Sequence, residues 1–291
     1  MIPAEYSVEI PDTTTPINLW GLGDFHVGNF TFDEGNLKRT IKGVATDDYA
    51  RVFLMGDHIE AIGKKDPRFV AECIPDKFIT DLDDIFVAQT DYVVDLLMPI
   101  ADKIIGVHGG NHEKSTLKHN SFNALKYLVR ELNAVSQNKI LNLGYGGALT
   151  RFHIKRGIHT STLIISTAHG RGGGEQKGGK ANRLQRLTGK IDADIYLRGH
   201  THELWGFGQP QIGMPRKGNL KILANPKVLA YCGCYFQTYA EGAASYGEEL
   251  EYYPTEMGSP RLRIKAEPYE IETTIRSSTS DLSQLRDYVQ P

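Results

Sequence analysis

Apolar positions along the chain follow two alternating spacings, and this alternation predicts a layered α/β fold. Short apolar runs, which are typical of buried strands, recur between stretches in which an apolar residue appears every three to four positions, the spacing of a helix. The strand-like runs lie at 17–22, 51–56, 103–107, 148–155, 161–168 and 194–197. Strands that alternate with helices in this way indicate an α/β architecture.

The clearest helical pattern covers residues 75–98, where apolar side chains recur at helical spacing until Pro99 ends the pattern. Further helices are expected in the polar stretch that precedes 51–56, at 120–133 and near 180–189. These segments separate consecutive predicted strands, as the helices of α/β units do.

Residues 219–275 read mostly as β structure, and their hairpins predict a second sheet packed on the first. The chain shows no internal repeat and no long linker. Both observations favour a single domain over residues 1–291.

The composition is that of an ordinary globular protein, with 40% hydrophobic and 23% charged residues. A net charge of −2 gives no global attraction to nucleic acids or membranes. No apolar run approaches the roughly 18 residues of a spanning helix, and the N-terminus lacks the features of a secretory signal. The CxC pair Cys232 and Cys234 is read as part of a buried strand rather than as soft-metal ligands. We therefore expect a cytoplasmic protein without membrane contact.

Polar side chains follow five of the predicted strands, each beside a glycine. In chain order they are Asp24 and His26, then Asp57, then Asn111 with His112 and Glu113, then His169, and finally His200 with His202. A single Gly-Asp or Gly-Asn pair is usually a turn. Five in succession indicate a site, because ligands collect beyond the carboxyl ends of strands in α/β sheets. We expect all five clusters to face one rim of the fold.

The donor atoms of these clusters indicate a metal centre. Seven residues offer oxygen or imidazole donors and none offers a thiolate: Asp24, His26, Asp57, Asn111, His169, His200 and His202. Such donors suit Mn²⁺, Fe, Zn²⁺ or Ni²⁺ better than a structural zinc site built from cysteines. With one bridging carboxylate, seven ligands match two ions about 3.5–4 Å apart. We expect two divalent ions, Mn²⁺ before the others, with Mg²⁺ as a further alternative.

The ordered set of motifs resembles the calcineurin-like metallophosphoesterase superfamily, and within it the phosphodiesterase and DNA-repair exonuclease branch. The family pattern D-x-H, GD, GNH[DE], H-G and GHxH is complete between residues 24 and 202. The resemblance implies a four-layer α/β/β/α sandwich with two mixed sheets flanked by helices. Residues 203–291 would form its mostly β C-terminal part.

The resemblance also implies a role for each residue. The first ion would be held by Asp24, His26, Asp57 and His202. The second would share Asp57 and be completed by Asn111, His169 and His200. His112 would not be a ligand but would lie near the leaving oxygen, with Glu113 as a candidate orienting partner. A metal-bridging hydroxide would attack phosphorus, and His112 would protonate the leaving group as general acid.

The substrate is less narrowly predicted. Many phosphomonoesterases of the family carry GDxxDR, whose arginine clamps a terminal phosphate; here Glu60 keeps the acidic position and Ala61 replaces the arginine. We therefore favour a phosphodiesterase or nuclease. The alternatives are a phosphomonoesterase acting on a small molecule or a protein, and a catalytically silent scaffold. His58 is expected to lie behind the ligands or to face solvent.

Residues 171–190 hold six basic side chains and one acid, Glu175, directly after His169. This segment is either a loop with a solvated basic helix face or a contact for a polyanion such as a nucleic-acid backbone. Residues 241–256 weigh against long DNA, since they would repel it if they folded over the same rim. They carry the acids Glu241, Glu248, Glu249, Glu251 and Glu256 and no base.

Overall fold

The structure is a computed structural model of the 291-residue chain. It describes residues 1–63, 66, 69, 73–79, 82–172, 174, 176–214, 222–239, 248, 251, 253–254, 256–265 and 270–277. Glu175, Glu241 and Glu249, which entered the charge arguments above, lie outside the described residues. In the described part, no helix has both the length and the apolar character needed to cross a membrane.

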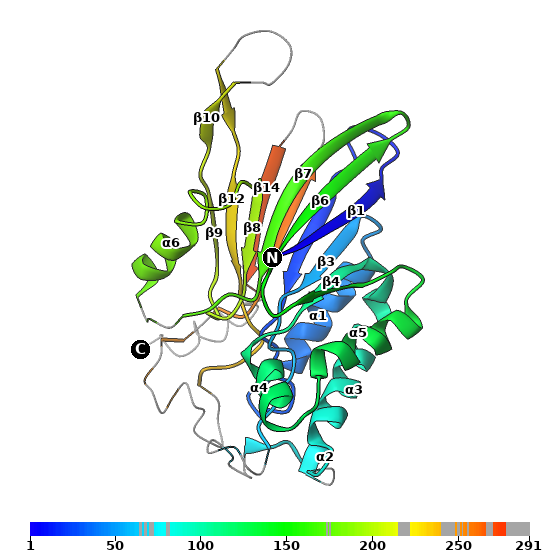
Figure 1. The fold of residues 1–291 in the computed structure, drawn as a ribbon, viewed down its shortest axis with the longest axis vertical. Coiled ribbons are helices and arrows are strands. Elements are labelled where there is room, and N and C mark those ends of the chain that lie inside the picture. The colour runs from blue at the N-terminus through cyan, green and yellow to red at the C-terminus, as the bar shows by residue number, and fades with distance from the viewer. Residues whose placement is uncertain are drawn as a thin grey trace, which may run out of the picture.

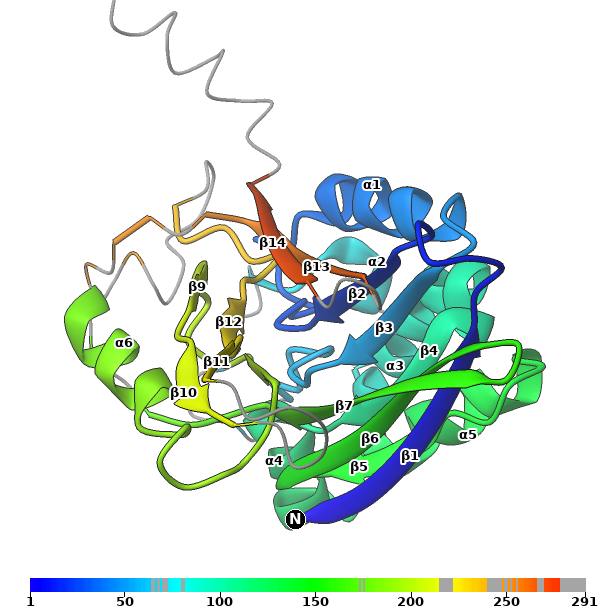
Figure 2. The same cartoon turned by 90° about the horizontal axis from the view of Figure 1, so that it is seen from above.

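Two six-stranded mixed sheets form the centre of the molecule (Figures 1 and 2). The first sheet has the order β14 (Glu270–Ser277), β13 (Gly258–Lys265), β2 (Ile17–Leu22), β3 (Ala50–Leu54), β4 (Ile104–His108) and β5 (Leu141–Gly144). The second has the order β1 (Ile2–Glu9), β6 (Gly147–Arg156), β7 (His159–Ala168), β8 (Ile195–Arg198), β12 (Val228–Cys232) and β9 (Leu204–Gly208). A separate two-stranded ribbon joins β10 (Gln211–Gly213) to β11 (Leu223–Asn225).

One hydrophobic core lies between the first sheet and its helices, and another lies between the two sheets. Alternate side chains of each strand point to the same face, and those of the inner faces meet there; Leu19 and Phe53 of the first sheet and Phe152 and Ile165 of the second are fully buried in one cluster. This packing fixes the two sheets face to face, so strand ends from both sheets open onto a common rim.

Helices cover the outer faces of both sheets. Along the first sheet these are α1 (Glu34–Ala45), α2 (Asp76–Ile79), α3 (Ile85–Leu97) and α5 (Ala124–Val135), with a short 3₁₀ helix at Met98–Lys103. On the opposite side lies α6 (Lys177–Gln185), which buries Leu184 against Tyr196, Leu229 and Tyr231 of the second sheet (Figure 1). The predicted α/β/β/α sandwich with two mixed sheets is confirmed.

Several elements were not anticipated by the apolar pattern, among them β1, β5 and α4 (Asn111–His119). The strand β1 pairs only with β6, at the edge of the second sheet, and most of its side chains are exposed or half-buried. The four-residue strand β5 is too short for a clear alternation. The helix α4 is polar on most of its surface, and Glu113 caps its start by accepting a hydrogen bond from the Gly110 N–H at 2.8 Å.

Two further predictions differ from the structure. The helical pattern of 75–98 spans two helices, α2 and α3, rather than one. The C-terminal hairpin β13–β14 joins the first sheet rather than the second, because β13 pairs antiparallel with β2. That register places Leu262 opposite Leu19 and buries it between the sheets.

Candidate metal centre

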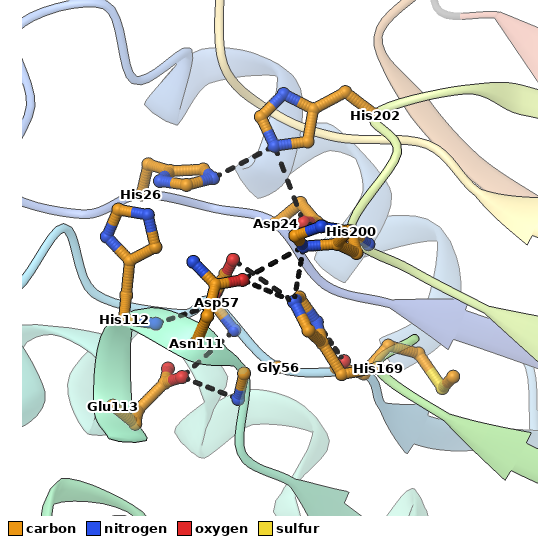
Figure 3. Close-up of polar contacts among 12 residues, drawn as sticks. Asp24, His26, Gly56, Asp57, Asn111, His112, Glu113, His169, His200 and His202 are labelled. Atoms are coloured by element: carbon orange, nitrogen blue, oxygen red, sulfur yellow. Dashed lines mark hydrogen bonds and ion pairs between the residues drawn. The ribbon is translucent and has the colours of Figure 1, made fainter. Parts of the chain in front are cut away.

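The five polar clusters lie at the carboxyl ends of neighbouring strands. In the first sheet β2, β3 and β4 run parallel and lead to Asp24, Asp57 and Asn111 respectively. In the second sheet β7 and β8 run parallel and lead to His169 and His200. The structure therefore brings all five clusters to one rim, as the sequence predicts (Figure 3).

One group of side chains joins Asp24, His26 and His202. The Nε2 atoms of the two imidazoles are 3.1 Å apart, and His202 Nε2 lies 3.5 Å from Asp24 Oδ1. One ligand atom from each residue lies within 4.8 Å of those of the others, close enough to hold a single ion. This group contains three of the four ligands expected for the first metal.

A second group joins Asp57, His169 and His200. His169 Nε2 lies 3.2 Å from Asp57 Oδ2 and 3.2 Å from His200 Nδ1. Asn111 Oδ1 faces the same point, 3.1 Å from His169 Nε2 and 2.9 Å from His200 Nδ1. These are the four residues expected for the second metal.

The protonation pattern of two imidazoles fits metal binding. The Nδ1 atom of His26 lies 2.8 Å from Glu60 Oε2, and that of His169 lies 2.9 Å from the Met55 carbonyl oxygen. Each Nδ1 therefore donates its proton away from the rim, which turns Nε2, the nitrogen that would bind an ion, toward the other donors. Histidines that bind metals are oriented by hydrogen bonds of this kind, so the residues present fit divalent ions.

The backbone of the candidate ligands is held in an unusual conformation. Among the described residues, eight that are not glycine have positive φ, and five of them are predicted ligands. Those five are Asp24 (51°), His26 (55°), Asp57 (50°), His200 (71°) and His202 (54°). Left-handed backbone at residues other than glycine costs about 1–3 kcal/mol and clusters at functional sites. The concentration of such residues here sets the rim apart from an ordinary set of turns.

Two glycines allow the strand ends to approach each other. A Cβ atom at Gly110 would lie 2.0 Å from Asp57 Oδ1. Gly56 has a φ of 97°, and a Cβ there would lie 2.7 Å from the Gly110 backbone nitrogen. Any side chain at these positions would push apart the loops that carry Asp57 and Asn111.

The buried acidic and imidazole side chains at the rim shift one another's pKa values. Burial alone would raise the pKa of Asp57, but the attraction of His169 and His112 holds that pKa well below its usual range. Burial would lower the pKa of His169, and Asp57 instead raises it to about 10. A buried carboxylate that stays anionic at neutral pH is suited to bind a cation, which would compete with the proton on the neighbouring imidazole.

Glu60 has a role that the sequence did not reveal. Besides His26, its carboxylate accepts a hydrogen bond from Asn29 Nδ2 at 3.2 Å, and it lies 3.9 Å from His112 Nδ1. His112 Nδ1 also contacts the Glu60 backbone carbonyl oxygen. Burial would lower the pKa of His112, but Asp57 and Glu60 raise it. The only sequence signal was the acidic position of the GDxxD-like motif, three residues after Asp57.

Glu113 lies behind the rim, and its carboxylate bonds to backbone N–H groups rather than to the His112 side chain. Its carboxylate accepts the backbone N–H groups of Asp57 at 3.1 Å, His58 at 2.6 Å and Gly110 at 2.8 Å. The His58 ring, fully buried, lies 3.1 Å from the same carboxylate. Glu113 thus ties the start of α4 to the Asp57 loop, while Glu60 takes the position beside His112 that had been expected for Glu113.

The segment that follows β12 ties the two sheets together at the rim. Backbone N–H groups at 233, 235 and 237 donate hydrogen bonds to carbonyl oxygens of Glu203, Asp24 and Thr31, at 2.8, 3.0 and 2.9 Å. The ring of Phe236 lies 5.2 Å from that of His26 and 5.7 Å from that of His202. Phe236 therefore packs against both imidazoles of the first group.

Comparisons with known proteins return structural similarity alone. No family model and no curated protein matches the chain. One similar solved structure is a conserved uncharacterized protein, a predicted phosphoesterase, from Streptococcus pneumoniae, with 13% identity, 90% of this chain and 99% of that chain covered, and a TM-score of 0.34. Another is a metallophosphoesterase from Sphaerobacter thermophilus, with 12% identity and a TM-score of 0.34; the similarity covers 94% of this chain and 95% of that chain. The assignment of the site rests on its own side chains.

Proposed function

We propose that the protein is a metal-dependent phosphoesterase that prefers phosphodiesters. The observation that carries the proposal is the pair of adjoining donor groups, Asp24 with His26 and His202, and Asp57 with His169 and His200, at one rim. Two ions held there would activate water and neutralise phosphoryl charge. Asp24, His26 and His202 would hold one ion and Asn111, His169 and His200 the other, with Asp57 shared.

In this proposal His112 protonates the leaving oxygen. Its Nδ1 contacts the Glu60 carbonyl, so its Nε2–H is the proton that remains to be donated. The negative charges of Asp57 and Glu60 favour the imidazolium form by raising the pKa of His112. The backbone N–H of His112 donates to Asp57 Oδ1 at 2.9 Å, which fixes the acid beside the shared carboxylate.

The preference for diesters is supported at position 61. Ala61 is buried, and its backbone N–H donates to Gln89 Oε1 at 3.0 Å. No cation extends from this position to clamp a terminal phosphate, and a diester carries one charge fewer than a monoester. A nucleic acid is the polymeric diester that we propose as a candidate substrate. We also propose Mn²⁺ as the native metal and a cytoplasmic location. We propose a single domain because β13, from the C-terminal part, pairs with β2, from the N-terminal part, in the same sheet.

A Mn²⁺-dependent hydrolysis panel tests the function. It compares bis-p-nitrophenyl phosphate, p-nitrophenyl phosphate, 2′,3′-cyclic nucleotides, and single-stranded and duplex DNA, with the Asp57→Asn variant as the blank. We expect the diester to be hydrolysed faster than the monoester. Faster monoester turnover would support the phosphomonoesterase alternative, and no turnover above the blank with any substrate and metal would support a silent scaffold.

A further inference from the structure

Helix α6 is fixed to the metal rim by a shielded ion pair. Lys180 Nζ lies 2.7 Å from Glu203 Oε1, and the two side chains are only 13% and 15% exposed. Glu203 directly follows His202 in the chain. The Tyr231 hydroxyl also donates to the Lys180 carbonyl oxygen at 3.0 Å. The first turn of α6 is therefore held next to the loop of the first metal group.

The outward face of α6 is basic. Leu184 packs its side of the helix against the second sheet, and the charged side chains on the other side are exposed. The exposed cations are Lys177, Arg183, Arg186 and Lys190. Residues 176–191 contain no acid. The described part of the segment thus presents a row of positive charge that begins near the metal rim.

This row ends in a surface depression that is lined by basic and uncharged residues. The depression is lined by Asn182, Gln185, Arg186, Thr188, Gly189 and Lys190. No carboxylate lies in the lining, and neither cation forms an ion pair within the described residues. The nearest acid in sequence, Asp192, pairs instead with Lys227 at 3.2 Å. Amide, guanidinium and ammonium groups gathered without an acid favour an anion.

The depression lies at the C-terminal end of α6, where a helix carries partial negative charge equivalent to about half an elementary charge. That charge is reduced here because following N–H groups bond to the last carbonyl oxygens, from Arg186 to Asn182 at 3.0 Å and from Leu187 to Leu184 at 3.1 Å. Two full positive charges outweigh what remains.

We propose that this depression binds a backbone phosphate of a nucleic-acid strand that is cut at the metal centre, an inference that rests on the proposed function. The nine residues of α6 form a helix about 13 Å long, whose first turn is held at the rim through Lys180 and whose last residue, Gln185, lines the depression. A small phosphate ester reaches only one end of that span. A strand of several nucleotides reaches both, and its regularly spaced charges match the row of cations along α6 and the turn that follows it.

The experiment compares two charge-matched variants of the full chain with Mn²⁺ present. R186Q/K190Q removes the cations of the depression. R39Q/K42Q removes an exposed arginine and lysine from α1, in the helical layer on the opposite side of the sheets (Figure 2). Binding of a fluorescent 12-nucleotide single strand with a hydrolysis-resistant phosphorothioate backbone is followed by anisotropy between 50 and 200 mM salt. Turnover of bis-p-nitrophenyl phosphate is measured in parallel.

We expect R186Q/K190Q to weaken binding of the strand about three- to tenfold and to flatten the plot of log K against log salt by about 0.7 per lost phosphate contact. Turnover of the small diester stays unchanged, and R39Q/K42Q binds like the wild type. Equal weakening in both variants, unchanged binding in R186Q/K190Q, or binding of linear polyphosphate without binding of the strand would overturn the inference. Failure of the wild type to hydrolyse the small diester would refute the proposed function instead, because strand binding is measured separately.

Discussion

At the scale of single residues, the position of Glu60 connects two imidazoles with different expected tasks. One carboxylate oxygen lies 2.8 Å from His26 Nδ1, and the same oxygen is 3.9 Å from His112 Nδ1. A carboxylate behind a metal-binding imidazole fixes its ring and increases its basicity. Glu60 therefore orients a candidate ligand and supports the charge of the candidate acid at once.

Glu60→Gln removes this charge while keeping the size of the side chain. We expect the affinity for the first metal ion to fall about 10-fold or more, since losing such outer partners typically costs 10–100-fold. Calorimetric titration with Mn²⁺ measures the change. Glu34→Gln, on the surface of α1, is the control, and equal affinity in both variants would contradict the role of Glu60.

Substitutions of His112 and Asp57 are expected to have different effects on metal content and turnover. His112→Gln should retain both metal ions and lose about 10²–10⁴-fold in turnover, because a general acid is lost and no ligand is. Asp57→Asn should lose metal and turnover together. Metal content measured beside the hydrolysis rate separates the two cases, and turnover retained in both variants would refute the assignment.

The buried imidazole of His108 predicts a dependence of stability on pH. It lies buried between the sheets, with Nε2 2.8 Å from Thr167 Oγ1, and burial lowers the pKa of His108 to about 3. The unfolded chain binds this proton near pH 6.5, so the contribution of His108 to stability is present above pH 6.5 and is lost as the pH falls toward 3. The limit is on the order of 5 kcal/mol, since one pKa unit corresponds to about 1.4 kcal/mol.

We therefore expect urea unfolding in EDTA to show a smaller loss of stability between pH 6.5 and 4.5 in His108→Gln than in the wild type. His159→Gln, at an exposed position of β7, should keep the wild-type slope. Identical slopes in all three proteins would show that His108 does not titrate in this way.

At the scale of elements, the segment after β12 links loops from both sheets. Its backbone hydrogen bonds reach Asp24 of the first sheet and Glu203 of the second, and Phe236 packs against the imidazoles of the first group. The second group, around His169, has no ring contact with Phe236 among the described residues.

Phe236→Leu should therefore disturb one metal group more than the other. We expect bound metal to fall from two ions toward one per chain after dialysis at limiting Mn²⁺, because the imidazoles of His26 and His202 lose their packing partner. Metal content by atomic spectroscopy measures this. Phe207→Leu, on β9, is the control, and loss of both ions together would indicate general destabilisation.

Sequence reasoning was strongest where a chemical pattern coincides with strand ends. The motifs identify residues that the fold brings to one rim, because parallel strands share the direction of their carboxyl ends. The pattern could not predict α4, whose residues carry a single large aliphatic side chain, Leu117. It also could not assign Glu60 and Glu113, since both are acids near a strand end and only the packing decides which one lies beside His112.

At the scale of the whole molecule, the candidate centre contains residues from both of the sheets whose inner faces form the apolar layer between them. Asp24 and Asp57 follow strands of the first sheet, whereas His169, His200 and His202 follow strands of the second. Each donor group therefore contains residues from both sheets. Ions bound there would crosslink the sheets in the folded state and have no such site in the unfolded chain.

Metal removal should accordingly lower thermal stability. A site that is filled at a ligand concentration of 100 times Kd adds about 2.7 kcal/mol, and for a chain of this size we expect the melting temperature to rise by at least about 5 °C when Mn²⁺ replaces EDTA. Differential scanning calorimetry measures the change. Asp57→Asn should show little of this rise, and a full rise in that variant would contradict ligation by Asp57.

The pairing of β13 with β2 has a consequence for how the chain is made. Ile17 of β2 lies opposite Ile264 of β13. The strand β2 is therefore synthesised long before β13, its partner on one side, which comes from near the end of the described chain. During synthesis β2 has β3 on one side and an open hydrogen-bonding edge on the other, and such edges recruit strands of other chains. The nascent protein is therefore exposed to intermolecular pairing until residues 258–265 leave the ribosome. Expression at low temperature or with a chaperone that shields strands should increase the soluble yield.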